Sequence, residues 1–451
     1  MRALAHTWAA LLLCGCVARG AATANTTSAS PATVETQPSA PPPDDSTALG
    51  PGARYASDAE RHIVSELAGA AERIRSLRFK SSVPVVVEDP TAIRRYIAGQ
   101  LKDDELDQAR KIYIALGMLP ADLDVRAMLL RVMGEQIMGY YDPHGQRLVI
   151  RDSVMKAFAT GGPHTELQAA RSVIVHELVH ALQDQHLGLG EVIDAERTSD
   201  ADTALRALVE GDANLAMLAG DDERGLGALR RLTRDPEAVR RLAELVLEPP
   251  PPDSELGRAP PIVRIPLLSA YSDGLVFAAG LHGAGGWSSI DAAHRRPPIS
   301  TQQILHPEHY ASDRRPVELP APVVDALGAN GYTPLPGDTL GELELRVFLA
   351  QGGASQAQAV SAAAGWAGDT VRVYEGPGGE LAVLWLLAWS SPEAALQAAH
   401  LARSQQAGLP TAERVTATVV QVGPRVLIAR GLPERYLRAL RSLLDPAGGP
   451  H

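Results

Sequence analysis

The sequence predicts an α+β protein, in which a mainly helical domain with a small mixed sheet precedes a small C-terminal α+β domain. Segments with apolar residues at helical spacing make up most of the first part of the chain. The tail instead alternates strand-like and helical segments around turns that contain Gly-Pro pairs. A length of 451 residues is enough for about two or three domains.

The first 16 residues predict a bacterial lipoprotein signal peptide. Met1-Arg2 forms a short basic region, and the apolar run after it is too short to anchor the chain across a bilayer. The run ends in Leu13-Cys14-Gly15-Cys16, which resembles a lipobox, so Cys16 is the predicted lipidated residue. The alternative is a plain secretory signal with incidental cysteines, since His6 makes the run less apolar than usual. We therefore expect an exported protein that is held in the bacterial cell envelope by a lipid anchor. The alternative is a soluble secreted protein.

Composition narrows the partners that the folded part can have. Residues 17–54 are rich in Ala, Thr, Ser and Pro, which predicts a disordered tether. Both cysteines lie within the first 16 residues, so the folded part has neither disulfides nor cysteine ligands for a metal. The formal net charge of -11 argues against a nucleic-acid partner and against electrostatic docking on an anionic membrane. Membrane contact is expected only through the N-terminal lipid.

The first domain is predicted over residues 55–335, and its elements follow from local patterns. Apolar spacing predicts a helix over 58–79, then a strand over 83–87. The turn signal Asp142-Pro143-His144-Gly145 between two strand-like runs predicts a hairpin. Further helices are expected over residues 90–101, 103–116, 123–133, 165–188, 194–219 and 271–281. Residues 295–310 read as an irregular polar stretch.

The tail, predicted as a unit over residues 336–451, has a β-β-α-β-β-α order. Its strands are expected over 371–374, 381–387, 416–421 and 425–429, and its helices over 392–406 and 434–444. This order predicts a small α+β sandwich.

The segment His176-Glu177-Leu178-Val179-His180 is the most informative motif in the chain. Two histidines four residues apart project from one face of a helix, close enough to bind one metal ion together. A glutamate beside the first can activate a water for metal-assisted peptide hydrolysis, which predicts one zinc ion as cofactor. The alternative is a chance occurrence of H-E-x-x-H, against which the helical spacing of apolar residues over 173–182 argues.

A catalytic zinc site needs a third protein ligand, and the sequence offers two candidates. His186 has the spacing of the third metzincin histidine, but Gln183 stands where that signature needs a helix-breaking glycine. On a continuous helix His186 would lie about 9 Å beyond His180 along the axis, so it is expected to contact carbonyls at the helix end. Glu210 lies in an apolar stretch of the next helix, and a buried carboxylate needs a partner such as a metal ion. The alternative is an exposed Glu210 on an amphipathic helix.

The two motifs together resemble the gluzincins, the thermolysin-like zinc metallopeptidases. His-Glu-Leu-Val-His-Ala-Leu-Gln-Asp-Gln with the later Leu-Val-Glu-Gly-Asp-Ala is similar to an uncharacterised bacterial branch of that group. The resemblance implies a zincin-like fold, with His176, His180 and Glu210 as zinc ligands and Glu177 as general base. The thermolysin pattern has an aspartate four residues after its glutamate ligand, whereas this chain has Asn214. Another carboxylate is therefore expected to orient a ligand histidine, the candidates being Asp200, Asp202 and Asp212.

Negative charge that develops on a substrate carbonyl needs a donor besides the metal. The candidates by residue type and surroundings are Tyr140, Tyr141, His306 and Tyr310, with His306 first because it lies in a polar loop. The hairpin at residues 139–141 is also a candidate edge strand, along which an extended peptide could add through its backbone.

The sequence thus predicts an exported zinc-dependent metallopeptidase that acts on a peptide or protein substrate. The first alternative is a zinc amidase that acts on cell-wall peptide. The second is a non-catalytic zinc-binding surface lipoprotein, against which the intact Glu177 argues because a structural zinc site needs no base.

Overall fold

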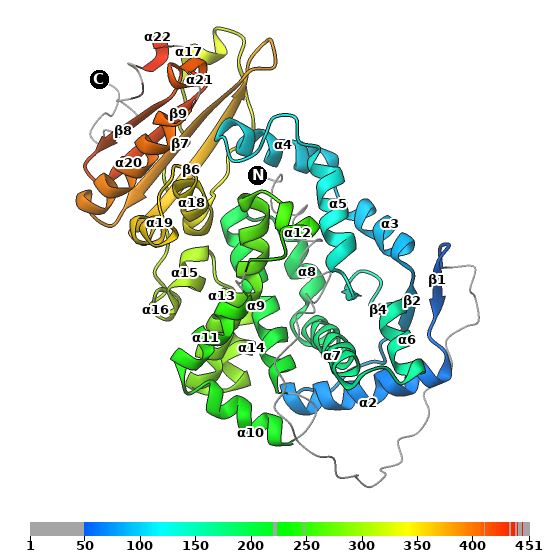
Figure 1. Ribbon diagram of the computed structural model, residues 1–451. Helices are drawn as coiled ribbons and strands as arrows, with labels where there is room; N and C mark the ends of the chain where they lie inside the picture. The colour runs from blue at the N-terminus through cyan, green and yellow to red at the C-terminus, as the bar shows by residue number, and fades with distance from the viewer. Residues whose placement is uncertain are drawn as a thin grey trace.

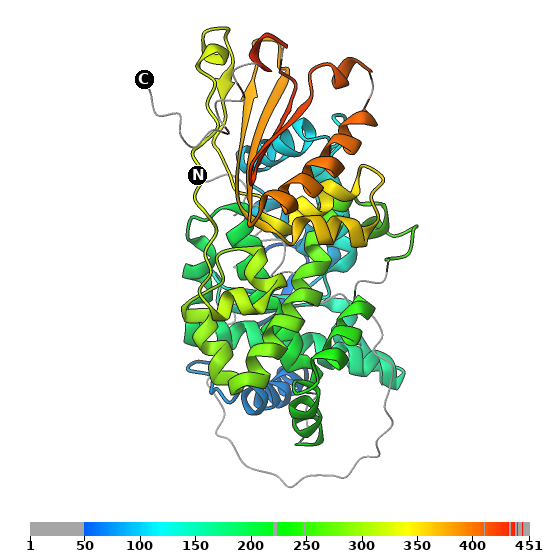
Figure 2. The same ribbon diagram turned by 90° about the vertical axis from the view of Figure 1, so that its left-hand side faces the viewer.

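The computed structural model describes residues 49–219, 223–246, 249–409, 411–432, 434–437, 440 and 444. The predicted signal peptide, Cys16 and most of the predicted tether lie outside these residues. The described residues form an α+β structure with two small sheets, as the sequence predicts. One sheet lies at one end of the molecule, helices fill the middle, and helix α2 runs along the opposite end (Figures 1 and 2).

The first sheet is mixed and has the strand order β1-β2-β4-β3. Its strands are β1 (Ala53–Tyr55), β2 (Val85–Glu88), β3 (Gly139–Asp142) and β4 (Arg147–Arg151). The predicted hairpin is present, because β3 and β4 pair antiparallel with Tyr141 opposite Leu148. The tether prediction ran slightly too far, since Ala53 and Arg54 already pair with β2. Strand β3 forms one edge of this sheet.

The helices of the first half mostly agree with the predicted ones. They are α2 (Asp58–Arg75), α3 (Pro90–Gln100), α4 (Asp103–Ala115), α5 (Val125–Gln136), α6 (Asp152–Thr160), α7 (His164–Leu187), α8 (Leu189–Asp194) and α9 (Ser199–Leu218). Helix α2 ends earlier than predicted because Ser76 adopts a left-handed conformation, with φ of 56°. Helix α9 begins later than predicted because the Thr198 side chain caps it. Helices α6 and α8 were not predicted.

The chain after α9 contains more helical residues than the sequence predicted. They are α10 (Glu223–Leu232), α11 (Pro236–Val246), α12 (Glu255–Arg258), α13 (Pro261–Gly285), α14 (Trp287–Arg295), α15 (Thr301–Leu305), α16 (Pro307–Ala311) and α17 (Asp325–Gly328). The stretch predicted as irregular contains α15, which Ser300 caps, and α16, which starts at Pro307. Helix α13 is long and apolar enough to cross a membrane, but 78% of its most apolar window is buried in the protein. We interpret it as a core helix.

Helices α9 and α13 approach each other closely at two glycines. A Cβ atom on Gly211 would lie 2.1 Å from the Gly274 carbonyl oxygen, and one on Gly274 would lie 2.2 Å from the Ala207 carbonyl oxygen. No side chain fits at either position, so the two backbones lie in direct contact. This contact sets the position of Tyr271, one turn before Gly274, relative to Glu210 on α9.

The second sheet is antiparallel and has the order β5-β6-β7-β9-β8. Its strands are β5 (Thr333–Pro334), β6 (Trp366–Glu375), β7 (Leu381–Trp389), β8 (Thr418–Val422) and β9 (Arg425–Arg430), and its helices are α18 (Gly341–Ala350), α19 (Gln356–Ala363), α20 (Pro392–Ala407), α21 (Thr411–Arg414) and α22 (Glu434–Leu437). The predicted β-β-α-β-β-α order is present from β6 to α22, with the short helix α21 inserted before β8, and most of the predicted last helix after Leu437 lies outside the described residues. Strand β5 and helices α18, α19 and α21 were not predicted.

The two predicted units share one hydrophobic core. A single cluster of buried side chains includes Ile97 of α3 and Leu129 of α5 together with Trp385 of β7. Strand β7 is buried on both faces, because Trp385 points into this cluster while Leu384 packs into a separate one on the other side. The tail therefore packs as part of the main body in the structure.

Asp200, at the start of α9, lies at the junction with the tail. Its Oδ1 atom accepts hydrogen bonds from the backbone N–H and the hydroxyl of Thr301, at 2.7 Å and 2.6 Å. The backbone N–H of Asp200 donates to the Thr339 carbonyl oxygen at 3.0 Å. Burial raises the pKa of Asp200 to about 8. The folded protein therefore favours the neutral carboxyl at pH 7.

We expect Asp200→Asn to stabilise the protein at alkaline pH and much less at pH 5. The folded pKa lies above the unfolded one, so the wild type loses free energy of unfolding as pH rises through that window, by about 1.4 kcal/mol per pH unit at most. Asparagine keeps an acceptor for both Thr301 bonds and does not ionise. Thermal denaturation at pH 5, 7 and 9 measures the difference, with the exposed Asp325→Asn as control. A difference in Tm between Asp200→Asn and the wild type that is the same at all three pH values would contradict the raised pKa of Asp200.

Candidate metal centre

Helices α7 and α9 bring together the three predicted metal ligands. The Nε2 atom of His176 lies 3.0 Å from Nε2 of His180 and 3.1 Å from Oε2 of Glu210. The distance from Nε2 of His180 to Oε1 of Glu210 is 3.8 Å. One ligand atom from each residue lies within 4.8 Å of the other two. Ligands about 2.0–2.1 Å from a tetrahedral zinc ion are roughly 3.3 Å apart, so the observed separations fit such an ion.

The protonation of this cluster also suits a metal. His176, His180 and Glu210 are at most 1% exposed. Burial lowers the pKa of His176 to about 3 and that of His180 to about 4, which keeps both imidazoles neutral and able to donate a lone pair. Burial raises the pKa of Glu210 to about 7, although the neighbouring His180, Arg206 and Tyr271 counteract the rise. A divalent cation would stabilise the ionised carboxylate.

The Glu177 side chain reaches from helix α7 to the edge strand β3. Its Oε2 atom accepts a hydrogen bond of 3.0 Å from the backbone N–H of Tyr141. Its Oε1 atom is buried and has no hydrogen-bond partner among the described residues. A Cβ atom on Gly139 would lie 3.0 Å from the Val149 carbonyl oxygen, which is a tight contact, and 3.7 Å from Cγ of Glu177, which is an ordinary one. Burial, and then the nearby Glu210, raise the pKa of Glu177 well above its ordinary value.

A buried hydrogen-bond chain orients His180. Its Nδ1 atom lies 2.8 Å from Oε1 of Gln183, which fixes the tautomer that leaves Nε2 free for a metal. The Gln183 amide nitrogen donates to Oδ2 of Asp212 at 2.9 Å. Asp212 also accepts from His294 Nε2 at 2.9 Å and forms a 2.8 Å ion pair with Arg75. Burial alone would raise the pKa of Asp212, but Arg75, His294 and Gln183 hold it at about 2.

Of the three aspartates that were candidates to orient a histidine, only Asp212 belongs to this chain of hydrogen bonds, and it acts through Gln183. Asp202 pairs with Arg206 at 2.6 Å, and Asp200 binds Thr301. Asn214 is close enough to His176 to raise its pKa against the effect of burial. Asn214 stands where the thermolysin pattern has an aspartate. It therefore lies next to a ligand histidine, as that aspartate would, but it carries an amide in place of the carboxylate.

We expect Gln183→Met to weaken zinc binding by roughly tenfold to a hundredfold, because His180 loses the acceptor that fixes its tautomer. Competition with a chromophoric zinc chelator measures the affinity, and circular dichroism checks the fold. Gln168→Met, at an exposed position on the same helix, is the matched control. Equal affinities in the two variants would show that Gln183 does not support a metal ligand.

The structure places the other predicted catalytic side chains away from this cluster. Side chains alternate along β3, so Tyr140 points away from α7, stacks on Tyr96 and donates to Glu88 at 3.2 Å. The imidazole of His306 lies 2.9 Å from a carboxylate oxygen of Glu342 in the tail. A hydrogen bond of 2.9 Å leads from the Tyr310 hydroxyl to the Arg296 carbonyl oxygen.

Tyr141 and His186 take part in the surroundings of α7. The Tyr141 hydroxyl donates to Asp184 at 2.8 Å, while the Tyr141 backbone contacts Glu177. His186 is not a ligand in this arrangement. Its Nε2 atom lies 2.6 Å from the Arg78 carbonyl oxygen, in the segment after α2. The sequence predicted a contact with carbonyls at the end of its own helix.

Sequence reasoning missed three residues at the cluster. Tyr271 of α13 stacks on His176 with ring centroids 6.4 Å apart, and its hydroxyl interacts with Glu210. Arg75 and His294 both bind Asp212, although they lie 137 and 82 residues from it in sequence. No local pattern marks these residues, apart from the unusual placement of Tyr271 in a strongly apolar run.

A family model described as a domain of unknown function (DUF8575) matches residues 333–440. This region holds the second sheet and most of its helices, and none of the residues of the metal cluster. No curated protein and no solved structure matches the chain. The family match therefore concerns the tail alone.

Proposed function

We propose that the chain is an exported zinc-dependent metallopeptidase with a zincin-like catalytic region. The observation that carries the proposal is the convergence of His176, His180 and Glu210 from two helices, with their ligand atoms within 4.8 Å of one another. This ligand set and the adjacent Glu177 are what the gluzincin resemblance implies. The proposal also includes export and lipidation at Cys16, and the sequence of the first 16 residues supports this part.

The residues of the cluster have distinct roles in this proposal. When bound, zinc polarises a carbonyl oxygen and makes water a stronger acid. Glu177 takes a proton from the attacking water at its unpartnered Oε1 atom and then gives it to the leaving amine. The Tyr141 N–H holds the other oxygen of Glu177 in place. Tyr271, which reaches Glu210 and His176, is a further candidate to stabilise charge on the substrate, beside the predicted donors His306, Tyr140 and Tyr310.

A substrate reaches this site only after a movement of the surrounding side chains. Glu177 and His180 are 0% exposed, and Tyr271 is 9% exposed. The close contact of α9 with α13 places Tyr271 over two of the ligands, so a shift of this tyrosine is one way to open the site. Strand β3, at the edge of its sheet and hydrogen-bonded to Glu177, is the element along which an extended peptide would add.

Metal removal tests the proposal directly. Purified protein loaded with one equivalent of zinc is expected to cleave casein, and chelator-treated protein is expected to be inactive until zinc is restored. The products are measured by mass spectrometry, with a cell-wall peptide as a second substrate. Cleavage of the cell-wall amide alone would favour an amidase. Zinc binding without cleavage of either substrate would favour a non-catalytic protein.

A further inference from the structure

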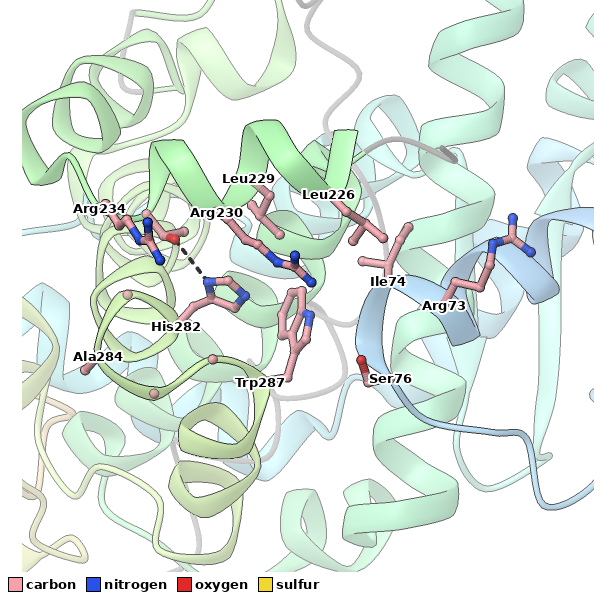
Figure 3. Close-up of a pocket in the computed structure, with 14 residues that line it drawn as sticks. Arg73, Ile74, Ser76, Leu226, Leu229, Arg230, Arg234, His282, Ala284 and Trp287 are labelled. Carbon is pink, nitrogen blue, oxygen red and sulfur yellow. Dashed lines mark hydrogen bonds between the residues drawn. The ribbon is translucent and has the colours of Figure 1, made fainter. Parts of the chain in front are cut away.

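A second candidate site lies in a cavity of about 310 Å³ between α2, α10, α13 and α14 (Figure 3). Its size is at the lower end of the range of small-molecule pockets. None of the metal-cluster residues lines it. The side chains that characterise it are Leu226, Leu229, Arg230, Arg234, His282 and Trp287.

The charge of this pocket differs from that of the whole protein. The chain carries a formal net charge of -11, yet none of the described residues that line the cavity is acidic. Arg230 and Arg234 are exposed, and within the described part of the chain neither guanidinium has a hydrogen bond or ion pair. By contrast, Arg240 and Arg241 on the next helix both lie within 4 Å of Glu237. The pocket thus presents two unpaired cations, which favours an anionic ligand.

Apolar and aromatic side chains also line the pocket. In Figure 3, Leu226 of α10 lies beside Ile74 of α2, and the Arg230 guanidinium lies beside the ring of Trp287. The ring of Trp287 packs edge-on against His282 with centroids 4.8 Å apart, and the guanidinium carbon of Arg75 lies 4.4 Å from its centroid. A ligand therefore meets a preformed aromatic surface beside the cations, which lowers the entropic cost of binding.

Only a few of the basic side chains around the pocket offer a positive charge to a ligand. Burial, then the nearby Arg75 and Arg230, lower the pKa of His282, so this imidazole is neutral at pH 7. Arg73 also lines the cavity, but its side chain points away from Trp287 and Arg230 (Figure 3). Arg230 and Arg234 are left as the two cations that line the pocket, and they lie on either side of His282 in Figure 3. Two guanidiniums can bind a carboxylate or a phosphate, and the apolar wall beside them favours a ligand with an apolar body, such as a small apolar carboxylate.

We propose that this pocket binds a small apolar carboxylate, such as the C-terminal residue of a peptide. The carboxylate lies between Arg230 and Arg234, and the apolar side chain packs against Leu226, Leu229 and Trp287. The proposal does not rest on the metal cluster, so it is tested with the full-length protein free of metal.

The probes are N-acetyl-L-leucine, the neutral N-acetyl-L-leucinamide and inorganic phosphate. Trp287 is partly exposed whereas Trp366 and Trp385 are buried, so tryptophan fluorescence should respond to ligand in the pocket, and isothermal titration calorimetry gives the Kd. We expect N-acetyl-L-leucine to bind at least about tenfold more tightly than either of the other probes. Absence of binding, or phosphate binding equal to or tighter than that of N-acetyl-L-leucine, would overturn the proposal.

Variants locate the binding. Arg230→Gln and Arg234→Gln are each expected to weaken N-acetyl-L-leucine about tenfold, because each removes a charged hydrogen bond to the carboxylate. Arg231→Gln, an exposed neighbour on α10 that does not line the cavity, is the matched control and should bind like the wild type. Equal effects of all three changes would mean that the probe responds to overall charge and that the pocket is not the site.

Discussion

Replacing Glu177 by glutamine is expected to abolish peptide hydrolysis while leaving zinc bound. Glutamine has nearly the same shape, and its carbonyl oxygen can still accept from the Tyr141 N–H, so the helix and the three ligands keep their positions. It cannot take a proton from water, and general base catalysis typically contributes about 10²- to 10⁴-fold to rate. We therefore expect kcat to fall by roughly 10³-fold with one equivalent of zinc retained.

Burial of Glu177 makes a second consequence measurable. The carboxylate is penalised in the closed site, so replacing it with a neutral amide should raise the free energy of unfolding of the metal-free protein at pH 8. Thermal denaturation records this gain, while zinc content and casein cleavage record the loss of function. Glu166→Gln, at an exposed position in the first turn of the same helix, should change none of these quantities. Wild-type activity in Glu177→Gln would rule out its role as the base.

The sequence was a good guide to features that depend on neighbouring residues. The H-E-x-x-H spacing and the apolar flanks predicted α7 and the direction of His176 and His180, because a helix fixes which residues share a face. The apolar run around Glu210 correctly indicated a buried carboxylate on the following helix. The hairpin was also predictable, since its turn residues and strand residues are adjacent in the chain.

Features that depend on tertiary packing were not predictable in this way. Arg75, which belongs to α2, forms a buried ion pair with Asp212, and nothing in the local pattern of α2 marks it. The start of α13 was missed because Pro266 usually argues against a helix interior, yet it lies inside this one. His306 was predicted as a catalytic donor from its polar surroundings, and the structure places it against Glu342 of α18, a contact that the sequence does not indicate. Apart from the proline, these features arise from contacts between distant segments of the chain.

Replacing Glu210 by alanine is expected to reduce zinc affinity by at least about a hundredfold, because two histidines alone leave a zinc ion short of a protein ligand. Zinc present at 100 times its Kd stabilises the wild type by about 2.7 kcal/mol, so the variant should also lose most of the rise in Tm that zinc causes. Competition with a chromophoric chelator and thermal denaturation with and without zinc measure both effects.

The matched comparison is His186→Ala, which separates the two possible third ligands. His186 contacts the Arg78 carbonyl oxygen and lies outside the group formed by His176, His180 and Glu210, so its loss should leave zinc affinity unchanged within about twofold. It should lower stability slightly, by about 1 kcal/mol, through the lost hydrogen bond. A large loss of zinc in His186→Ala with little loss in Glu210→Ala would instead support the metzincin-like arrangement. That result would require α7 to unwind after His180, against the continuous helix through Leu187.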